Sequence, residues 1–219
     1  MTDRRRFAAA AALVAACGGT VPGEVGSAAA ATFEPVVGKV RQGGELIGTG
    51  APSLDGVRWA DGEDHPLSED RGKVVLVRWW TDTCPFCRNS APAIRALSRK
   101  YGARLAVRAV YHDKVPGRTV EPAVAARRGR ALGFPGLIGH DDGWTALRRW
   151  WLAGGRRRDF TSVTFLLDRR GRIRLIHTGG EFHARDHVAK GSCRYEPEQC
   201  RREFDAIDRA IAALVAEES

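Results

Sequence analysis

The hydrophobic pattern of the chain alternates between strand-like and helix-like segments. Residues 74–77 are four consecutive apolar β-formers, and Trp79 and Trp80 follow after one arginine. Such a run predicts a buried strand. After a short polar turn, apolar residues recur at spacings of three and four, at Ala91, Ile94, Leu97 and Tyr101. This period predicts an amphipathic helix directly after the strand.

The second half of the chain continues the alternation. Residues 104–111 alternate apolar residues with others, which predicts a second strand. Two helical stretches, a β-hairpin and a terminal helix that starts at a proline come next. We expect them at residues 120–132, 144–152 and 163–177, and from residue 196 to the end of the chain. The order predicts an α/β domain with a helical insertion before the hairpin.

The region ahead of the central strand predicts an N-terminal β-hairpin and a tether. Residues 53–59, a polar turn and the stretch before Arg71 have the pattern of a hairpin, and we expect the domain to span residues 48–219. Residues 18–47 are rich in Gly, Ala and Val without a period, which predicts a flexible tether. Whether residues 33–40 dock on the domain as an extra strand is open.

The first 17 residues are typical of an export signal. Three arginines at 4–6 precede ten apolar residues, a stretch too short to span a membrane as a helix. The arginines resemble the twin-arginine export motif, and residues 13–17 resemble a bacterial lipobox, in which Cys17 carries the lipid anchor. We therefore expect an extracytoplasmic protein, in the periplasm or cell envelope, held on the membrane through Cys17. The alternative is an ordinary signal peptide in which Cys17 has no role.

Length and charge narrow the function only a little. The 219 residues suffice for one domain and a leader. The net charge is +9, and it becomes +7 without residues 1–16, which hold three arginines and one aspartate. The basic runs are scattered and do not form a nucleic-acid-binding module, so they suit an anionic membrane surface or acidic partners better. We expect a monomer with no nucleic-acid partner, no cofactor and no metal.

A cysteine motif lies where the central strand ends and the next helix begins. It consists of Cys84, Pro85, Phe86 and Cys87. A cysteine at a helix N-terminus faces unpaired N–H groups and the positive end of the helix dipole, which favour the thiolate. Cys87 lies one turn further on, where it can resolve a mixed disulfide formed at Cys84. The remaining cysteine pair is too far downstream for a zinc ribbon, so the motif predicts thiol–disulfide exchange.

Several blocks of the chain recur together in one known family. They lie at residues 50–54, 71–80, 84–87 and 164–171. In this order they resemble the TlpA/ResA-like branch of the thioredoxin-like superfamily. The resemblance implies a three-layer α/β/α thioredoxin-like fold and an extracytoplasmic thiol–disulfide oxidoreductase, with Cys84 as nucleophile and Cys87 as resolving cysteine. It also implies protein thiol or disulfide substrates and a membrane or soluble redox partner.

The chain departs from that family pattern in the loop before the hairpin. Thioredoxin-like proteins usually have a cis-proline there, facing the motif, and this chain has Thr161 and Ser162. The resemblance implies that Thr161 still presents its backbone to a substrate cysteine. Two interpretations are open: the loop keeps its shape without proline, or the Ser162 hydroxyl tunes Cys84 or opens the site to a metal.

The second departure is Arg78, six residues before Cys84, where thioredoxins have a buried acid. Either Arg78 faces the thiols and favours the thiolate, or it points to solvent. In neither case can it accept a proton at neutral pH. The spacing does not select a carboxylate for that task among Glu63, Asp64, Asp82 and Glu121.

A second group of potential ligands precedes the last helix. It consists of His177, His183, His187, Cys193 and Cys200. In an exported protein a structural disulfide between Cys193 and Cys200 is the expected state. A zinc or copper site formed with the histidines is the alternative.

Two other functions compete on the same fold. A Sco-like copper chaperone binds its metal through two cysteines and a downstream histidine, but it has three residues between the cysteines where this chain has two. A peroxiredoxin has a proline seven residues before the reactive cysteine, where this chain has Val77. The pattern therefore favours the oxidoreductase, and leaves its client and the direction of electron flow open.

Overall fold

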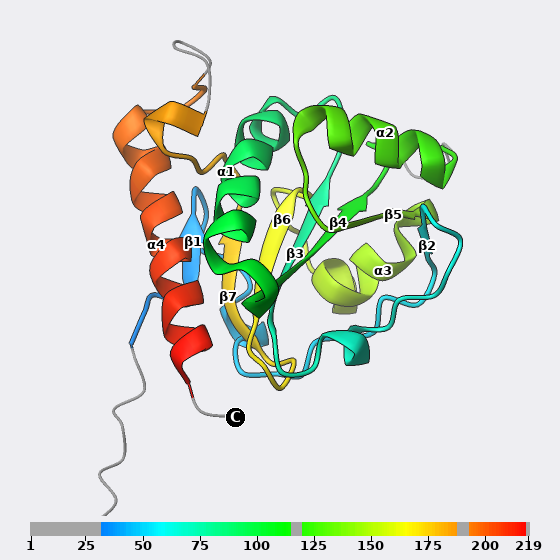
Figure 1. Cartoon of the computed structure of the whole chain (residues 1–219), viewed down its shortest axis with the longest axis horizontal. Coiled ribbons are helices and arrows are strands. Elements are labelled where there is room, and N and C mark those ends of the chain that lie inside the picture. The colour runs from blue at the N-terminus through cyan, green and yellow to red at the C-terminus, as the bar shows by residue number, and fades with distance from the viewer. Residues whose placement is uncertain (1–31, 115–119, 188–192, 218–219) are drawn as a thin grey trace, which may run out of the picture. The chain divides into compact units, whose positions relative to one another are not determined.

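A seven-stranded mixed β-sheet forms the centre of the domain, with the strand order β1-β7-β6-β3-β4-β5-β2 (Figure 1). The computed structural model describes residues 32–114, 120–187 and 193–217. The strands are β1 (Val36–Gly38), β2 (Val57–Trp59), β3 (Val74–Trp80), β4 (Leu105–Tyr111), β5 (Leu137–Asp141), β6 (Val163–Leu167) and β7 (Ile173–Thr178). The α-helices are α1 (Pro85–Tyr101), α2 (Pro122–Leu132), α3 (Thr145–Leu147) and α4 (Pro197–Ala216).

The central strand β3 is buried along its whole length, and its alternating side chains divide the core into two parts. On one face, Leu76 and Trp80 pack with residues of α1, α2 and α4. On the other face, Val77 and Trp79 pack with α3 and the helical turn that follows it. Because helical segments cover both faces of the sheet, the predicted three-layer thioredoxin-like architecture is confirmed.

The helices form where the periodicity predicts them. Helix α2 ends at Gly133, whose φ of 103° favours glycine over other residues. The predicted insertion consists of α3 and a π-helical turn, Arg148–Leu152, and the hairpin of β6 and β7 follows it. Helix α4 starts with Pro197 in its first turn. In the described part of the chain, no helix has the length and apolar character needed to cross a membrane.

The predicted N-terminal β-hairpin is wrong. Residues 48–73 are all described, and they contain one strand, β2, which pairs antiparallel with β5 at the edge of the sheet. The chain then forms a 3₁₀ turn, Leu67–Asp70, in place of a second strand. Asp70 is buried there and pairs with the buried Arg108 of β4, with 2.7 Å between oxygen and nitrogen. Contacts with distant strands, and not pairing between neighbours, therefore fix this region.

The domain begins earlier than the expected boundary at residue 48. Residues 36–38 form β1, which pairs parallel with β7 and answers the open question about this segment. Strand β1 forms here because pairing with the sheet edge buries the apolar side chains of Val36 and Val37. The export segment with Cys17, and residues 18–31 of the expected tether, lie outside the described residues.

Candidate active site

The cysteine motif lies at the junction of β3 and α1, as the sequence predicts. Cys84 is the N-cap of α1, and Pro85 follows it in the first turn, where a missing N–H costs no hydrogen bond. The Cys84 N–H donates to the Thr81 carbonyl at 3.3 Å, so a tight turn connects the strand to the helix. Cys84 is half-buried and Cys87 is fully buried. The site therefore has one accessible sulfur and one hidden sulfur.

Arg78 points from β3 toward the thiols. Its side chain is fully buried, and Nη2 lies 3.8 Å from Sγ of Cys87. Nη1 donates to Oγ1 of Thr164 at 3.0 Å, and the guanidinium lies 5.8 Å from the centre of the Phe182 ring. Of the two orientations that the sequence left open, the structure thus has the one beside the motif. A permanent cation in this place stabilises a thiolate and cannot act as a base.

These surroundings separate the pKa values of the two cysteines. Hydrogen bonds from the Cys87 thiol and backbone N–H, together with the Arg78 charge, outweigh burial and lower the pKa of Cys84 to about 5. Burial raises the pKa of Cys87 well above its usual value, and its hydrogen bond to Cys84 raises that pKa further. At neutral pH the accessible sulfur is therefore a thiolate and the hidden one a neutral thiol.

The loop of Thr161 and Ser162 faces the motif, as the resemblance implies. Oγ of Ser162 lies 3.2 Å from Sγ of Cys87. The described part of the chain contains no cis peptide bond, so Ser162 follows a trans bond. Both loop residues line a depression of about 220 Å³ together with Cys84, Phe86 and other neighbours. A substrate that reaches Cys84 would lie in this depression, against the loop.

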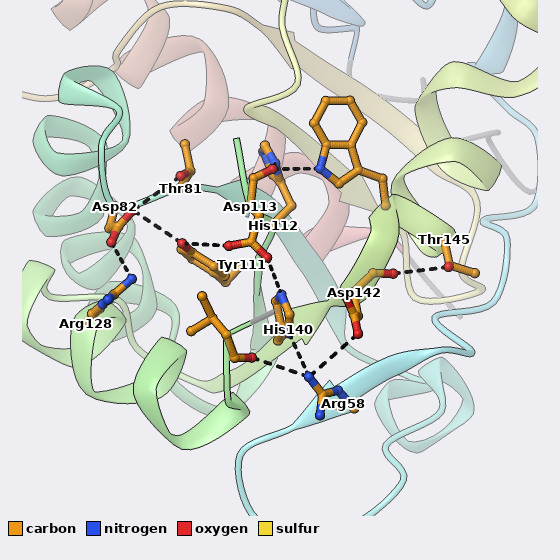
Figure 2. A network of polar contacts seen from close by, with 12 residues as sticks. Arg58, Thr81, Asp82, Tyr111, His112, Asp113, Arg128, His140, Asp142 and Thr145 are labelled. Carbon is orange, nitrogen blue, oxygen red and sulfur yellow. Dashed lines mark hydrogen bonds and ion pairs between the residues drawn. The ribbon is translucent and has the colours of Figure 1, made fainter. Parts of the chain in front are cut away.

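A polar network fixes the turn that precedes the motif (Figure 2). Asp82 pairs with Arg128 of α2 at 2.6 Å, and the Tyr111 hydroxyl lies 3.3 Å from the same carboxylate. That hydroxyl is also 3.4 Å from Asp113, which contacts Nε2 of His140 at 3.1 Å. The network connects the ends of β3, β4 and β5, so it positions the turn from three strands at once.

No carboxylate of the described residues contacts either sulfur of the motif. Of the four candidates that the sequence offered, Asp82 is engaged in the network, and Glu63 and Asp64 are exposed on the polar turn. Glu121 is the N-cap residue of α2. The chain therefore places a cation, Arg78, where a thioredoxin has its acid, and the resolving thiol has no built-in carboxylate base in this part of the chain.

The second cysteine pair also comes together. One ligand atom each of Glu181, His183, Cys193 and Cys200 lies within 4.8 Å of the others. All four cysteines of the described residues are free thiols in the structure, so the Cys193–Cys200 disulfide stays a prediction. Glu181 is not among the ligands predicted from the sequence. Its place two residues before His183, in the same loop as the cysteines, is the signal that marks it.

The other two histidines of that predicted group do not belong to this set of four side chains. Nε2 of His177 is 2.7 Å from Glu203 of α4, and the His187 ring packs against the Phe204 ring at 4.9 Å. Among the described residues, the one group of three or more candidate ligands is that around His183, and it does not include the cysteines of the motif. The arrangement expected of a Sco-like copper site is therefore not formed.

Comparisons with known proteins agree with this fold. The AhpC/TSA family model matches residues 47–176, more than half of the chain. The thioredoxin-like protein YneN of Bacillus subtilis is 29% identical over 136 residues, which are 60% of this chain and 71% of that protein.

Solved structures give the same architecture. A thiol:disulfide interchange protein of Chlorobium tepidum TLS superposes with a TM-score of 0.53 at 16% identity, covering 77% of this chain and 97% of its own. A thiol-disulfide isomerase of Corynebacterium glutamicum gives a TM-score of 0.52 at 20% identity, covering 77% and 98%. At these identities the likeness shows the fold, which is thioredoxin-like. With the family match over most of the folded domain, the chain belongs to the AhpC/TSA family.

Proposed function

We propose that the protein is an extracytoplasmic thiol–disulfide oxidoreductase of the TlpA/ResA-like type, acting on protein thiols or disulfides. One observation carries the proposal: an accessible cysteine at a helix N-terminus, with its pKa lowered to about 5, lies beside a buried thiol one turn away. This combination provides a nucleophile at neutral pH and a second thiol that reacts only after it.

The reaction needs no group beyond the two cysteines and the client. The Cys84 thiolate attacks one sulfur of a client disulfide, and the other client sulfur leaves as a thiolate. The Cys87 thiol then loses its proton and attacks Cys84, which forms the Cys84–Cys87 disulfide and releases the second client sulfur. The client gains two electrons from the motif; of the two protons that its thiolates take up, one is the proton that Cys87 gives up and the other comes from solvent, because Cys84 already reacts as a thiolate. The reverse sequence oxidises a client dithiol.

The surface around Cys84 suits an extended polypeptide. The depression in front of it is lined by Phe86, Phe160 and the backbone and side chains of Thr161 and Ser162. Apolar rings can contact client side chains, and the free edge of the loop can pair with client backbone. Because apolar contacts and backbone pairing do not select particular client residues, we expect tolerance toward client sequence.

The activity can be measured directly on the purified protein. We expect the reduced protein to accelerate the reduction of insulin by dithiothreitol. We also expect the oxidised protein to equilibrate with glutathione buffers, which gives the redox potential of the Cys84–Cys87 pair. That potential decides between reductase and oxidase. A protein that is inert toward insulin and toward other protein disulfides contradicts the proposal.

We also propose export and lipid anchoring at Cys17, on the basis of the leader pattern in residues 1–17. We expect the mature protein to fractionate with membranes and to begin at Cys17. The Cys17→Ser variant should be released from the membrane in soluble form, because the lipid on this one residue supplies the anchor. Fractionation and N-terminal mass spectrometry measure both. Recovery of the unprocessed full-length chain from the cytosol contradicts this localisation.

A further inference from the structure

A group of four side chains outside the active site has the composition of a metal centre. It comprises Glu181, His183, Cys193 and Cys200, here called the Glu-His-Cys-Cys cluster. Nε2 of His183 lies 3.1 Å from Sγ of Cys193 and 3.7 Å from a carboxylate oxygen of Glu181. Sγ of Cys200 lies 3.7 Å from the same oxygen. Ligands of a tetrahedral zinc ion, with bonds of about 2.0–2.3 Å, are separated by about 3.3–3.8 Å, so these distances suit one ion.

The neighbours of the cluster orient its ligand atoms. Nδ1 of His183 lies 3.2 Å from the Ala184 carbonyl, an acceptor, so Nδ1 carries the proton and Nε2 keeps its lone pair for a metal. One oxygen of Glu181 accepts from the Asn89 side chain at 2.5 Å, and the other accepts from the Arg194 N–H and faces the cysteines. Partners of this kind accompany metal-binding histidines and carboxylates in proteins.

The burial of the cluster leaves a charge to be balanced. Glu181, His183 and Cys200 are almost fully buried, and Cys193 is half-buried. Among the described residues, His183 is the one side chain able to carry a positive charge that pairs with Glu181. A buried carboxylate without an arginine or lysine partner is costly, whereas a divalent cation between the carboxylate and two sulfurs offsets the cost.

We propose that the Glu-His-Cys-Cys cluster binds one zinc ion. Two thiolates, an imidazole and a carboxylate are the donors that zinc takes in four-coordinate protein sites. On binding, the Cys193 and Cys200 thiols release their protons to solvent, and no oxidation or reduction takes place. The site is independent of the thiol–disulfide activity proposed above, so either can fail without the other.

The zinc site has a structural route to the active site. The ion connects the loop after β7 to α4, since Cys200 lies in the first turns of that helix. Asn89, which holds Glu181, belongs to α1, the helix that carries the motif at its start. Tyr195, two residues after Cys193, stacks on the ring of Phe86 within the motif, with 5.0 Å between ring centres and 9° between planes. Bound zinc thus fixes one wall of the entrance to Cys84.

Zinc uptake by the reduced full chain tests the proposal. The chain is treated with a phosphine reductant and zinc and then dialysed, and the zinc and the free thiols per chain are measured. In a second experiment cobalt(II) replaces zinc as a spectroscopic probe of thiolate ligation. The decisive variant is Cys193→Ser, because this half-buried residue is the ligand whose loss disturbs folding least. The matched controls are His187→Ala, a nearby histidine outside the cluster, and the Cys84→Ser/Cys87→Ser double variant.

We expect one zinc per chain in the wild type and in both controls, and a thiolate-to-cobalt charge-transfer band in each. Cys193→Ser should lose the stoichiometric zinc and most of that band. Asn89→Ala, which keeps all four ligands, should weaken zinc binding by about 10–100-fold, as is typical of a group that orients a ligand.

Any one of four results would overturn the zinc site. The first is a reduced wild type that takes up no zinc, and the second is a Cys193→Ser protein that keeps it. The third is a Cys193–Cys200 disulfide, mapped by mass spectrometry in protein isolated from its own cell envelope, because a disulfide removes both thiolates. A double variant that loses zinc would place the metal at the motif and would also contradict the proposal.

Discussion

Cys87→Ser should accumulate stable mixed disulfides with client proteins, whereas Cys84→Ser should accumulate almost none. The accessible thiolate of Cys84 attacks the client first, and the buried Cys87 then resolves the mixed disulfide. Without the resolving thiol, the mixed disulfide persists until an external thiol cleaves it. Non-reducing gels and mass spectrometry of the adducts measure the outcome.

The same pair of variants should differ from the wild type in turnover. Removing a nucleophile typically costs several orders of magnitude, so we expect Cys84→Ser to lose about 10³-fold or more of the insulin-reducing activity. The Cys84→Ser/Cys87→Ser double variant is the control for adducts formed through other cysteines. If Cys84→Ser traps adducts and Cys87→Ser does not, the roles are reversed; if both trap equally, the two cysteines have no separate roles, and if neither traps any, exchange through the motif is excluded.

The central part of the fold could be predicted because its signals are local. The apolar run of β3, the helical period of α1 and the position of Pro85 all lie within one stretch and act through backbone preference and burial. The hairpin of β6 and β7 surrounds a turn that ends in Gly171, whose φ is positive. Such features do not depend on distant contacts, so the sequence was enough.

The edges of the sheet could not be predicted in the same way. Strand β5 contains Gly139 and Asp141, residue types that are depleted in strands, and it was not expected. It forms because it lies between β4 and β2, and because Asp141 accepts hydrogen bonds from the N–H groups of Ala146 and Leu147 at 2.8 and 2.6 Å. The pairings with β4 and β2 join segments that are far apart in the sequence, and they leave no local pattern.

The active site likewise has a part that could be predicted from the sequence and a part that could not. The cysteine motif was found from spacing, but the direction of Arg78 depends on which face of β3 turns toward α1, and both faces of that strand are buried. Glu181 was missed because a single glutamate in a polar loop resembles many others until folding places it beside His183. Sequence spacing identifies groups that act together in one turn, and it does not identify groups that tertiary contacts assemble.

Replacing Arg78→Met should raise the pKa of Cys84 by about 1–3 units, which is the effect of removing a nearby opposite charge. Arg78 adds its charge to the hydrogen bonds from Cys87 in lowering this pKa to about 5. Met keeps much of the side-chain volume, and Arg78→Lys is the matched control that keeps the charge. The ultraviolet absorbance of the thiolate, titrated in each reduced variant, gives the pKa.

The redox potential should change with the pKa. The depressed pKa of Cys84 stabilises the reduced protein; this stabilisation is fully present above the free-thiol value of about 8.5 and is lost as the pH falls through about 5. At pH 7 the reduced wild type holds a thiolate beside the cation, and the disulfide form does not. Loss of the cation therefore disfavours the reduced form, and at pH 7 the potential should become more negative by about 30 mV for each unit that the pKa of Cys84 rises toward 7.

The Arg78→Met substitution disfavours the reduced protein, but it should not destabilise the oxidised protein. In that state the buried Arg78 guanidinium has no thiolate to neutralise it, and its Nε lacks a partner among the described residues. An apolar side chain of similar volume removes this uncompensated charge, so oxidised Arg78→Met should unfold at a temperature no lower than that of the wild type. A pKa and potential that stay unchanged in Arg78→Met, or change equally in Arg78→Lys, would show that Arg78 acts by packing and not by charge. If the charge is decisive, Arg78 makes the oxidised state less stable and the thiolate of Cys84 more stable, and both effects make the motif a stronger oxidant.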